Sequence, residues 1–528
     1  MSALQEEVLK RRTFAIISHP DAGKTTLTEK FLLYGGAIQL AGSVKGKKNS
    51  RHATSDWMDI EKQRGISVTS SVLQFHYQGY CINILDTPGH QDFSEDTYRT
   101  LMAADCAVMV IDAAKGVEAQ TRKLFKVCTM RHIPIFTFIN KMDRETKDPY
   151  ALLEEIEKEL GIETCAINWP IGAGKEFKGV YERSSNKILQ CIAVDGGKKE
   201  VEEREITMDD PAIKDILGTD LYHTLIEDIE LLDMAGSQYD IDRIHQGKLS
   251  PVCFGSALTN FGLGPFLKHF LAMTTPPLPR VTNDICIDPC SEDFSAFVFK
   301  IQANMNKAHR DRMAFMRICS GTFKKGMEVY HYQGKRKIKL NQSKQLLASQ
   351  REEVDEAFAG DIIGVFDPGI FSIGDTITTG KKRFAFAGIP TFAPEHFALV
   401  RNKDTMKRKQ FVKGIEQIAK EGAIQIFTEL GGGMEEIIVG VVGVLQFSVL
   451  EYRLEHEYGV DIIKTPLPYQ YVRWLKGDAT IPSLNLSSDT KVVQDLKGQP
   501  ILLFTNEWGI RWASEKNSNA TFMEFSES

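Results

Sequence analysis

The chain lacks a leader-like N-terminus, a membrane-length apolar run and a strong charge bias. Residues 1–7 contain no apolar signal region. The most apolar stretch, residues 437–450, is too short to span a bilayer, because a spanning helix needs about 20 residues. The formal net charge of -6 indicates no general affinity for polyanions. We therefore expect a cytoplasmic protein that does not associate with membranes.

Cysteine is scarce and scattered, with nine residues in 528. The closest pair, Cys286 and Cys290, has no second pair or histidine cluster at zinc-ligand spacing. This pattern argues against a disulfide framework and a structural zinc site, and it favours free thiols in a reducing compartment. A composition of 42% hydrophobic and 25% charged residues is typical of a soluble globular protein, and the length suggests three or four folding units.

A phosphate-binding pattern follows the first apolar run, residues 14–17. It consists of Ser18, His19, Pro20, Asp21, Ala22, Gly23, Lys24, Thr25 and Thr26. Such a loop between a strand and a helix binds phosphate through its backbone N–H groups and the helix N-terminus. Lys24 would add a charge at the β- and γ-phosphates, and Thr25 a hydroxyl for Mg²⁺. Ser18 stands where the usual pattern has its first glycine, and a small residue still permits the turn.

A second motif follows the buried strand predicted at residues 81–85 and comprises Asp86, Thr87, Pro88, Gly89 and His90. Asp86 is expected to bind Mg²⁺ at the end of this strand. Gly89 can bring its N–H close to a γ-phosphate. His90 is the candidate for orienting the attacking water, so His90 and Lys24 are predicted to be catalytic.

The polar, glycine-rich segment of residues 37–69 is typical of a loop that a ligand orders. It ends near Ser67, whose hydroxyl would complete the Mg²⁺ shell when a γ-phosphate is present. An ordinary serine at the start of a strand is an equally good interpretation.

A third motif predicts which base is bound and comprises Asn140, Lys141 and Asp143, after the strand predicted at residues 133–139. Asp143 can accept two hydrogen bonds from guanine, whereas adenine would leave the carboxylate unpaired. Small residues after a later strand, Ser256, Ala257 and Leu258, would let a backbone N–H approach the guanine carbonyl. GTP and GDP are therefore the expected ligands, with Mg²⁺.

Together, and in this order, these motifs resemble those of the translation-factor GTPases. The resemblance implies a GTP hydrolase that the ribosome stimulates by moving His90 into place. It also implies an α/β P-loop domain over residues 1–280, with an insertion at about residues 172–246 to which no chemistry can be assigned.

The remaining chain predicts two further domains. The proline-rich residues 275–280 form a stiff boundary, and short β patterns with turn glycines predict an antiparallel β-barrel over residues 281–385. An α/β (α+β) pattern follows over residues 386–528, including a helix at residues 404–421 with one apolar face. The polar tail after Ser514 is expected to fray.

Residues 297–305 and 309–312 of the barrel resemble the release-factor branch of the same family. This resemblance implies a protein of translation termination that promotes the dissociation and recycling of class I peptide chain release factors. Its expected partners are the ribosome and those factors, and away from the ribosome it is expected to be a monomer. Basic runs at residues 45–48, 335–339 and 407–409 would contact ribosomal RNA, although each alone is more simply a solvated face.

Two alternatives remain open. One is another ribosome-bound GTPase, such as a rescue or ribosome-protection factor. The other is a binding module that senses guanine nucleotides without hydrolysing them.

Overall fold

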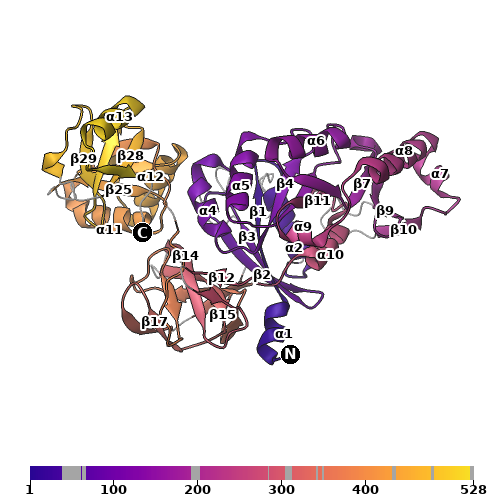
Figure 1. Ribbon diagram of the computed structural model, residues 1–528, viewed down its shortest axis with the longest axis horizontal. Coiled ribbons are helices and arrows are strands. Elements are labelled where there is room, and N and C mark those ends of the chain that lie inside the picture. The colour runs from indigo at the N-terminus through magenta and orange to yellow at the C-terminus, as the bar shows by residue number, and fades with distance from the viewer. Residues whose placement is uncertain are drawn as a thin grey trace.

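The computed structural model describes residues 1–38, 61, 67–191, 203–282, 285–303, 312–340, 343–347, 350–389, 391–430, 436–476 and 481–523. Figure 1 shows three bodies: a large N-terminal domain, a β-rich body below it and a C-terminal body at the upper left. The fold class expected from the sequence, a P-loop domain followed by a barrel and an α/β domain, is confirmed. None of the described helices combines the length and apolar character that a bilayer crossing requires.

The N-terminal domain is built on a mostly parallel sheet. Its strands, in spatial order, are β2 (Ser71–Tyr77), β3 (Tyr80–Asp86), β1 (Arg11–Ser18), β4 (Cys106–Asp112), β5 (Ile135–Asn140), β11 (Leu249–Phe254) and β6 (Glu163–Ala166). All neighbours are parallel except β2, which is antiparallel to β3. Alternate residues of β4 enter two separate apolar cores, one on each face of the sheet. Burial on both faces explains the near-continuous apolar run of this strand.

Helices cover both faces of this sheet. They are α2 (Lys24–Tyr34), α4 (Ser94–Leu101), α5 (Ala119–Met130), α6 (Pro149–Leu160), α9 (Ile241–His245) and α10 (Leu263–Met273), with the short 3₁₀ turns η1 (Gln91–Phe93) and η2 (Gly174–Glu176). The first helix, α1 (Ala3–Leu9), packs instead against the barrel, because its Val8 belongs to the barrel core. The ends of α6 follow from its sequence. Asp148 caps its first turn, Pro149 occupies the first position, and Gly161 ends it in the left-handed conformation with φ 70°.

A small antiparallel sheet with two helices lies at the far end of this domain (Figure 1). It contains β7 (Asn168–Ile171), β8 (Gly179–Glu182), β9 (Lys187–Cys191), β10 (Glu203–Thr207), α7 (Ile213–Leu217) and α8 (Thr219–Ala235). Apolar residues of this sheet join the core that includes β4, so this part of the chain packs against the N-terminal domain.

The barrel domain has its own apolar core. Its strands are β14 (Ser295–Ala303), β15 (Arg312–Ser320), β16 (Thr322–Lys324), β17 (Glu328–His331), β18 (Arg336–Lys339), β19 (Ser343–Leu347), β20 (Gln350–Glu353), β21 (Glu356–Phe358), β22 (Ile362–Phe366) and β23 (Thr376–Thr378). A separate two-stranded sheet of β12 (Arg280–Val281) and β13 (Cys286–Ile287) precedes the barrel in the chain. β19 pairs with β2, Leu347 opposite Gln74, so one sheet of 15 strands runs through both domains.

The C-terminal domain packs helices against an eight-stranded sheet in the order β27-β24-β26-β25-β29-β30-β28-β31. The strands are β24 (His396–Asn402), β25 (Gln425–Glu429), β26 (Glu436–Val441), β27 (Ile462–Leu467), β28 (Tyr471–Lys476), β29 (Lys491–Gln494), β30 (Pro500–Phe504) and β31 (Thr521–Met523). The helices are η4 (Thr405–Lys407), α11 (Arg408–Lys420), α12 (Leu445–Tyr458), η5 (Ile481–Ser483) and α13 (Glu507–Lys516).

Of two sequence expectations for this domain, the structure confirms one and contradicts the other. The apolar face expected for the helix at residues 404–421 is present, since Phe411, Ile415 and Ile418 of α11 are buried. The expectation that the chain frays after Ser514 is wrong. α13 continues to Lys516, and β31 pairs with β28, because the pairing partner of this tail lies 45 and more residues earlier in the chain.

Candidate functional site

The phosphate loop joins β1 to α2, as the motif predicts. β1 ends at Ser18 and α2 begins at Lys24, with Gly23 in the left-handed conformation at φ 99°. A Cβ atom at Gly23 would lie 2.3 Å from the Asn140 amide nitrogen, so the loop needs glycine here for both conformation and space. The His19 side chain is buried, and burial lowers the pKa of its imidazole.

Asn140 ties together three loops on the base side of the site. Its amide nitrogen donates to the Ala22 carbonyl at 2.7 Å, and its oxygen accepts from the Ala257 N–H at 2.8 Å. Lys141 reaches from the same motif to the Asp21 carbonyl, with its Nζ at 2.5 Å. The structure thus brings the phosphate loop, the Asn140 motif and the Ser256 loop together, as their sequence order predicts.

The Asp143 carboxylate lies at the entrance to this side of the site. Its Oδ1 accepts from the Ser256 hydroxyl at 2.5 Å, and its side chain is 19% exposed. Leu258, in contrast, is 53% exposed, whereas Ala257 is fully buried. The second oxygen of Asp143 lies 4.0 Å from Nε of Arg144, whose side chain is 64% exposed.

Asp112 is a residue that the sequence analysis missed. It ends β4, and its Oδ2 accepts from Lys141 Nζ at 2.6 Å. Burial alone would raise the pKa of Asp112, but the Lys141 ammonium and the Ala114 N–H outweigh burial, and the pKa lies below its ordinary value. The carboxylate is therefore ionised and fixes the Lys141 stem. Its place at the carboxyl end of a central strand is the signal that would have found it.

On the phosphate side, Lys24 and Asp86 form a buried ion pair between Nζ and Oδ1. Thr25 is also buried in the first turn of α2. The Thr87 hydroxyl donates to the Ile16 carbonyl at 2.7 Å, which fixes the second motif against β1. A Cβ atom at Gly89 would lie 3.5 Å from Pro20 Cα, so this motif passes directly against the phosphate loop.

His90 is half-buried and turned toward its own segment. Its Nδ1 lies 3.3 Å from the Asp92 backbone nitrogen, from which it accepts when Nδ1 carries no proton, and 3.0 Å from the Asp92 carboxylate oxygen Oδ1, to which it donates when Nδ1 carries the proton. The imidazole thereby caps the 3₁₀ turn η1. Asp92 is the second residue that the sequence analysis missed, because its importance depends on a partner far away in the chain.

Ser67 lies among the described residues and is half-buried, whereas most of the segment at residues 37–69 lies outside them. The adjoining Val68 N–H donates to the Glu61 carboxylate at 2.9 Å. The basic run at residues 45–48 and residues 304–311 of the barrel match also lie outside the described residues.

Comparisons with known proteins identify the family of each domain. The model of the elongation factor Tu GTP binding domain matches residues 9–276, and that of elongation factor G domain 2 matches residues 293–380. A crystal structure of a Thermus thermophilus protein superposes with a TM-score of 0.68 at 21% identity and covers 92% of this chain and 72% of that one, which supports the fold. The chain is thus a translational GTPase that binds guanine nucleotides.

The remaining matches are more specific. The model of the class II release factor RF3 C-terminal domain matches residues 386–514. Peptide chain release factor 3 of Symbiobacterium thermophilum is 58% identical over 522 residues, which cover 99% of both chains. That of Gloeobacter violaceus is 53% identical over 523 residues, covering 99% of this chain and 98% of the relative. The chain belongs to the peptide chain release factor 3 family, and it is a GTP hydrolase of translation termination.

Proposed function

We propose that the ribosome stimulates this chain to hydrolyse GTP, and that the GTP cycle promotes the dissociation and recycling of class I peptide chain release factors. One observation carries the proposal. The nucleotide motifs converge at the carboxyl edge of one parallel sheet, in a chain that matches release factor 3 relatives over 99% of its length. The proposed setting is the cytoplasm, and the proposed state away from the ribosome is a monomer.

In this proposal, GTP binds along the loops that Asn140 ties together. The phosphate loop, from Ser18 to Thr26, binds the phosphates through backbone N–H groups, and Lys24 neutralises their charge. Asp143 selects guanine, with its position fixed by the hydroxyl of Ser256. His90 orients the attacking water beside Gly89. Most of the catalysis comes from positioning and charge neutralisation, because phosphoryl transfer requires little covalent chemistry from the protein.

Mg²⁺ fits the oxygen donors on the phosphate side. Thr25 and Asp86 supply a hydroxyl and a carboxylate, the hard ligands that Mg²⁺ prefers, and Ser67 is the proposed third. No three His, Cys, Asp or Glu side chains of the described residues form a metal cluster by themselves. This fits Mg²⁺, which typically combines one or two carboxylates with substrate phosphates and water. When bound, the ion neutralises phosphate charge.

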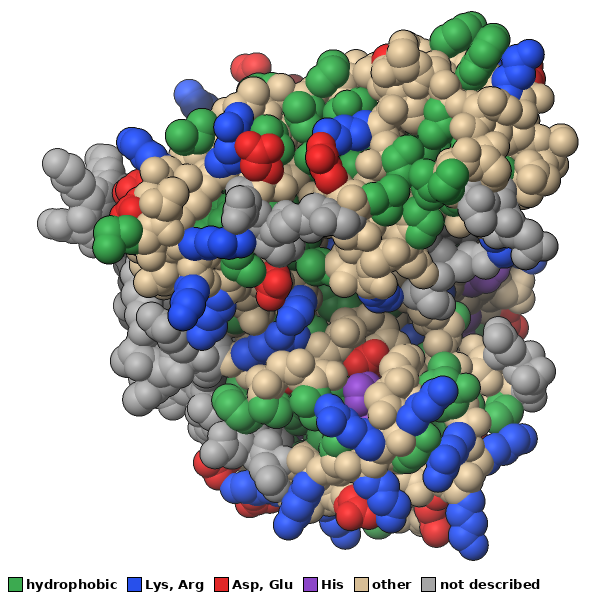
Figure 2. All heavy atoms as spheres, turned by 90° about the vertical axis from the view of Figure 1, so that its left-hand side faces the viewer, with side chains coloured by type: hydrophobic (Ala, Val, Ile, Leu, Met, Phe, Trp, Pro, Cys, Tyr) green, Lys and Arg blue, Asp and Glu red, His purple; other side chains and the backbone are tan. Residues whose placement is uncertain are grey.

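The proposed ribosome-facing surface is basic. Figure 2 shows Lys and Arg side chains spread over the lower part of one face, at the level of the barrel. The basic run at residues 335–339 lies on and beside β18 of the barrel, and most of its residues are exposed. Charge reversal at Lys335 and Lys337 should weaken ribosome binding and reduce its salt dependence, because fewer counterions are released. Unchanged affinity and salt slope would contradict an RNA contact.

The central test follows a labelled class I release factor as it leaves post-termination ribosomes. Acceleration by the protein with GTP, but not with GDP or with nucleotide alone, is the expected result. Intact ribosome-stimulated hydrolysis without acceleration would reject the termination role and retain the nucleotide chemistry.

His90→Ala tests the catalytic assignment. We expect ribosome-stimulated hydrolysis to fall at least about 100-fold, the usual contribution of a positioned acid or base. GTP affinity, measured with a fluorescent analogue, should stay unchanged because the side chain is not part of the network around Asn140. Full stimulated turnover in this variant would remove His90 from the mechanism.

A further inference from the structure

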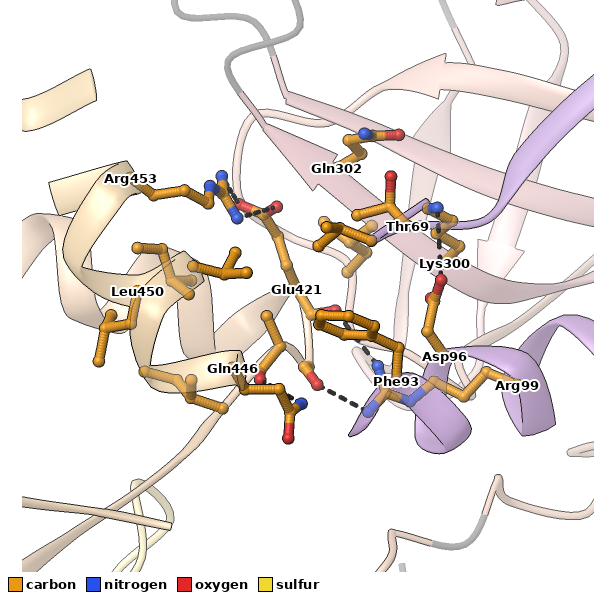
Figure 3. A pocket seen from close by; sticks show the side chains of 17 residues that line it. Thr69, Phe93, Asp96, Arg99, Lys300, Gln302, Glu421, Gln446, Leu450 and Arg453 are labelled. Carbon is orange, nitrogen blue, oxygen red and sulfur yellow. Dashed lines mark hydrogen bonds and ion pairs between the residues drawn. The ribbon is translucent and has the colours of Figure 1, made fainter. Parts of the chain in front are cut away.

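The segment that follows His90 lies across the ends of two helices of the C-terminal domain. Asp92 Oδ2 accepts from the Leu445 N–H at 2.7 Å, at the first residue of α12. Arg99 of α4 donates to the Gly422 carbonyl at 2.8 Å and to the Glu421 carbonyl at 3.3 Å, just after α11 (Figure 3). An anion thus meets the positive end of one helix dipole and a cation meets the negative end of the other.

Both helix ends carry glycine where these side chains approach. A Cβ atom at Gly443 would lie 2.2 Å from Asp92 Cγ and 2.5 Å from Asp92 Cα. A Cβ atom at Gly422 would lie 2.0 Å from an Arg99 guanidinium nitrogen. The turn at Gly443 is formed by its own domain, because the Gln446 side-chain oxygen accepts from the Val442 and Gly443 N–H groups at 2.9 and 3.0 Å. The C-terminal domain therefore presents a preformed receptor for Asp92.

Apolar contacts surround this polar contact. Val68, Phe93 and Val449 form a separate buried cluster, against which Leu445 and Tyr452 pack. Beside it, a cavity of about 50 Å³ lies where the three domains meet, and Figure 3 shows Phe93, Arg99, Lys300 and Glu421 around it. Val68, just before β2, and Phe93 of η1 thus belong to one apolar cluster with Val449 of α12.

The two oxygens of Asp92 have different partners. Oδ2 accepts from the Leu445 N–H of α12, whereas Oδ1 lies 3.0 Å from Nδ1 of His90 and accepts from it in the form of the imidazole that carries its proton on Nδ1. Because one rigid carboxylate makes both contacts, a movement of α12 away from Asp92 changes the support of the His90 imidazole.

We propose that Asp92 is a positioning residue that couples His90 to the docking of the C-terminal domain. With the domain docked, Asp92 is fixed between Leu445 and His90, and the imidazole is held against η1 instead of turning to the γ-phosphate. Separation of α12 releases the carboxylate and allows His90 to orient water. This inference rests on the catalytic role proposed for His90.

Gly443→Ala tests the coupling from the C-terminal side, without substituting any residue of the nucleotide site. The added methyl group must displace Asp92, so we expect single-turnover GTP hydrolysis without ribosomes to rise at least about fivefold, the lower end of typical coupling between sites. GTP affinity should stay unchanged. The matched control is Val444→Ala in the same turn, because Val444 is 59% exposed and its loss leaves the Leu445 N–H in place. Equal rates for the Gly443→Ala variant, the control and the wild type would overturn the proposal.

Asp92→Asn provides a second test on a variant of nearly the same shape. It should also raise ribosome-free hydrolysis, and adding Gly443→Ala to it should give no further increase, since both changes act through one carboxylate. If Gly443→Ala multiplies the rate by the same factor in both backgrounds, Asp92 does not carry the coupling and the proposal is wrong. His90→Ala on the ribosome tests the underlying catalytic role separately, so failure of that role and failure of the coupling give different results.

Discussion

The N-terminal domain has buried ion pairs to the barrel and helix-end contacts to the C-terminal domain at opposite ends of its parallel strands. The ion pairs to the barrel lie where strands begin: Arg11 opens β1 and bonds Asp361 at 2.8 Å, and Asp105, just before β4, bonds Arg317 at 2.5 Å. A further barrel residue, Lys300, reaches α4 where the three domains meet. The C-terminal domain instead contacts the segment after β3, beside the nucleotide motifs. Only the second contact includes residues adjacent to His90. The difference indicates that the barrel is a fixed attachment, whereas the C-terminal domain is placed to respond to the nucleotide.

The strongest test of this comparison is at the barrel. Arg317 is 1% exposed, and besides Asp105 it bonds the Gly360 carbonyl at 2.5 Å. Arg317→Met should lower the free energy of unfolding by about 3–5 kcal/mol, because it leaves Asp105 buried without its partner. Denaturant unfolding measures this loss, with the exposed Arg336→Met as the control. GTP affinity should not change. A stability loss as small as that of the control would show that the barrel is not held here.

A smaller effect is expected at the C-terminal contact. Gly422 has φ 75° and Gly498 has φ 78°, so alanine at either position should cost about 1–2 kcal/mol of left-handed strain. Gly422→Ala should cost about 1 kcal/mol more, because its methyl group displaces the Arg99 hydrogen bonds, whereas Gly498 has open space around it. Calorimetric unfolding of both variants checks this difference. Equal losses would mean that Arg99 contributes nothing to docking.

The smallest effect concerns Lys300, which lies 3.8 Å from Asp96 at the junction of the three domains. Burial lowers the pKa of Lys300, because burying the ammonium charge costs free energy. This cost offsets much of the stability that the ion pair with Asp96 contributes. Burial alone would raise the pKa of Asp96, but the Lys300 ammonium and the Ser70 bonds hold it below its ordinary value. The stability that ionised Asp96 contributes is therefore present above about pH 4 and is lost as the pH falls through the lowered value.

Lys300→Met should start this acid loss at a higher pH and should cost less stability at neutral pH than Arg317→Met, because Asp96 keeps its hydrogen bonds from Ser70 and its side chain is 22% exposed. Unfolding measured as a function of pH, with and without the substitution, gives both quantities. An unchanged acid profile would show that Lys300 does not influence Asp96.

The nucleotide motifs were predictable from the sequence because each is a short run whose chemistry is complete within a few residues. The fold class was predictable for a related reason, since apolar periodicity and turn residues are local signals. The residues that form the contacts between domains were not predictable from the sequence. Asp92 gains its partner 353 positions away, at Leu445, and no local pattern distinguishes it from an ordinary acidic residue in a helix turn. The strands after Gln470 were missed for the same reason, because each pairs with a distant segment.

The pairing of β19 with β2 also has a consequence for solubility. β2 lies beside β3 at one side of the sheet of the N-terminal domain, and its other side faces the barrel. An unpaired strand edge is a template for aggregation with other chains. A fragment that ends at the predicted boundary after residue 280 would expose this edge. The barrel therefore covers a strand edge of the N-terminal domain within the same chain. Expression of the N-terminal domain alone is expected to give aggregated material.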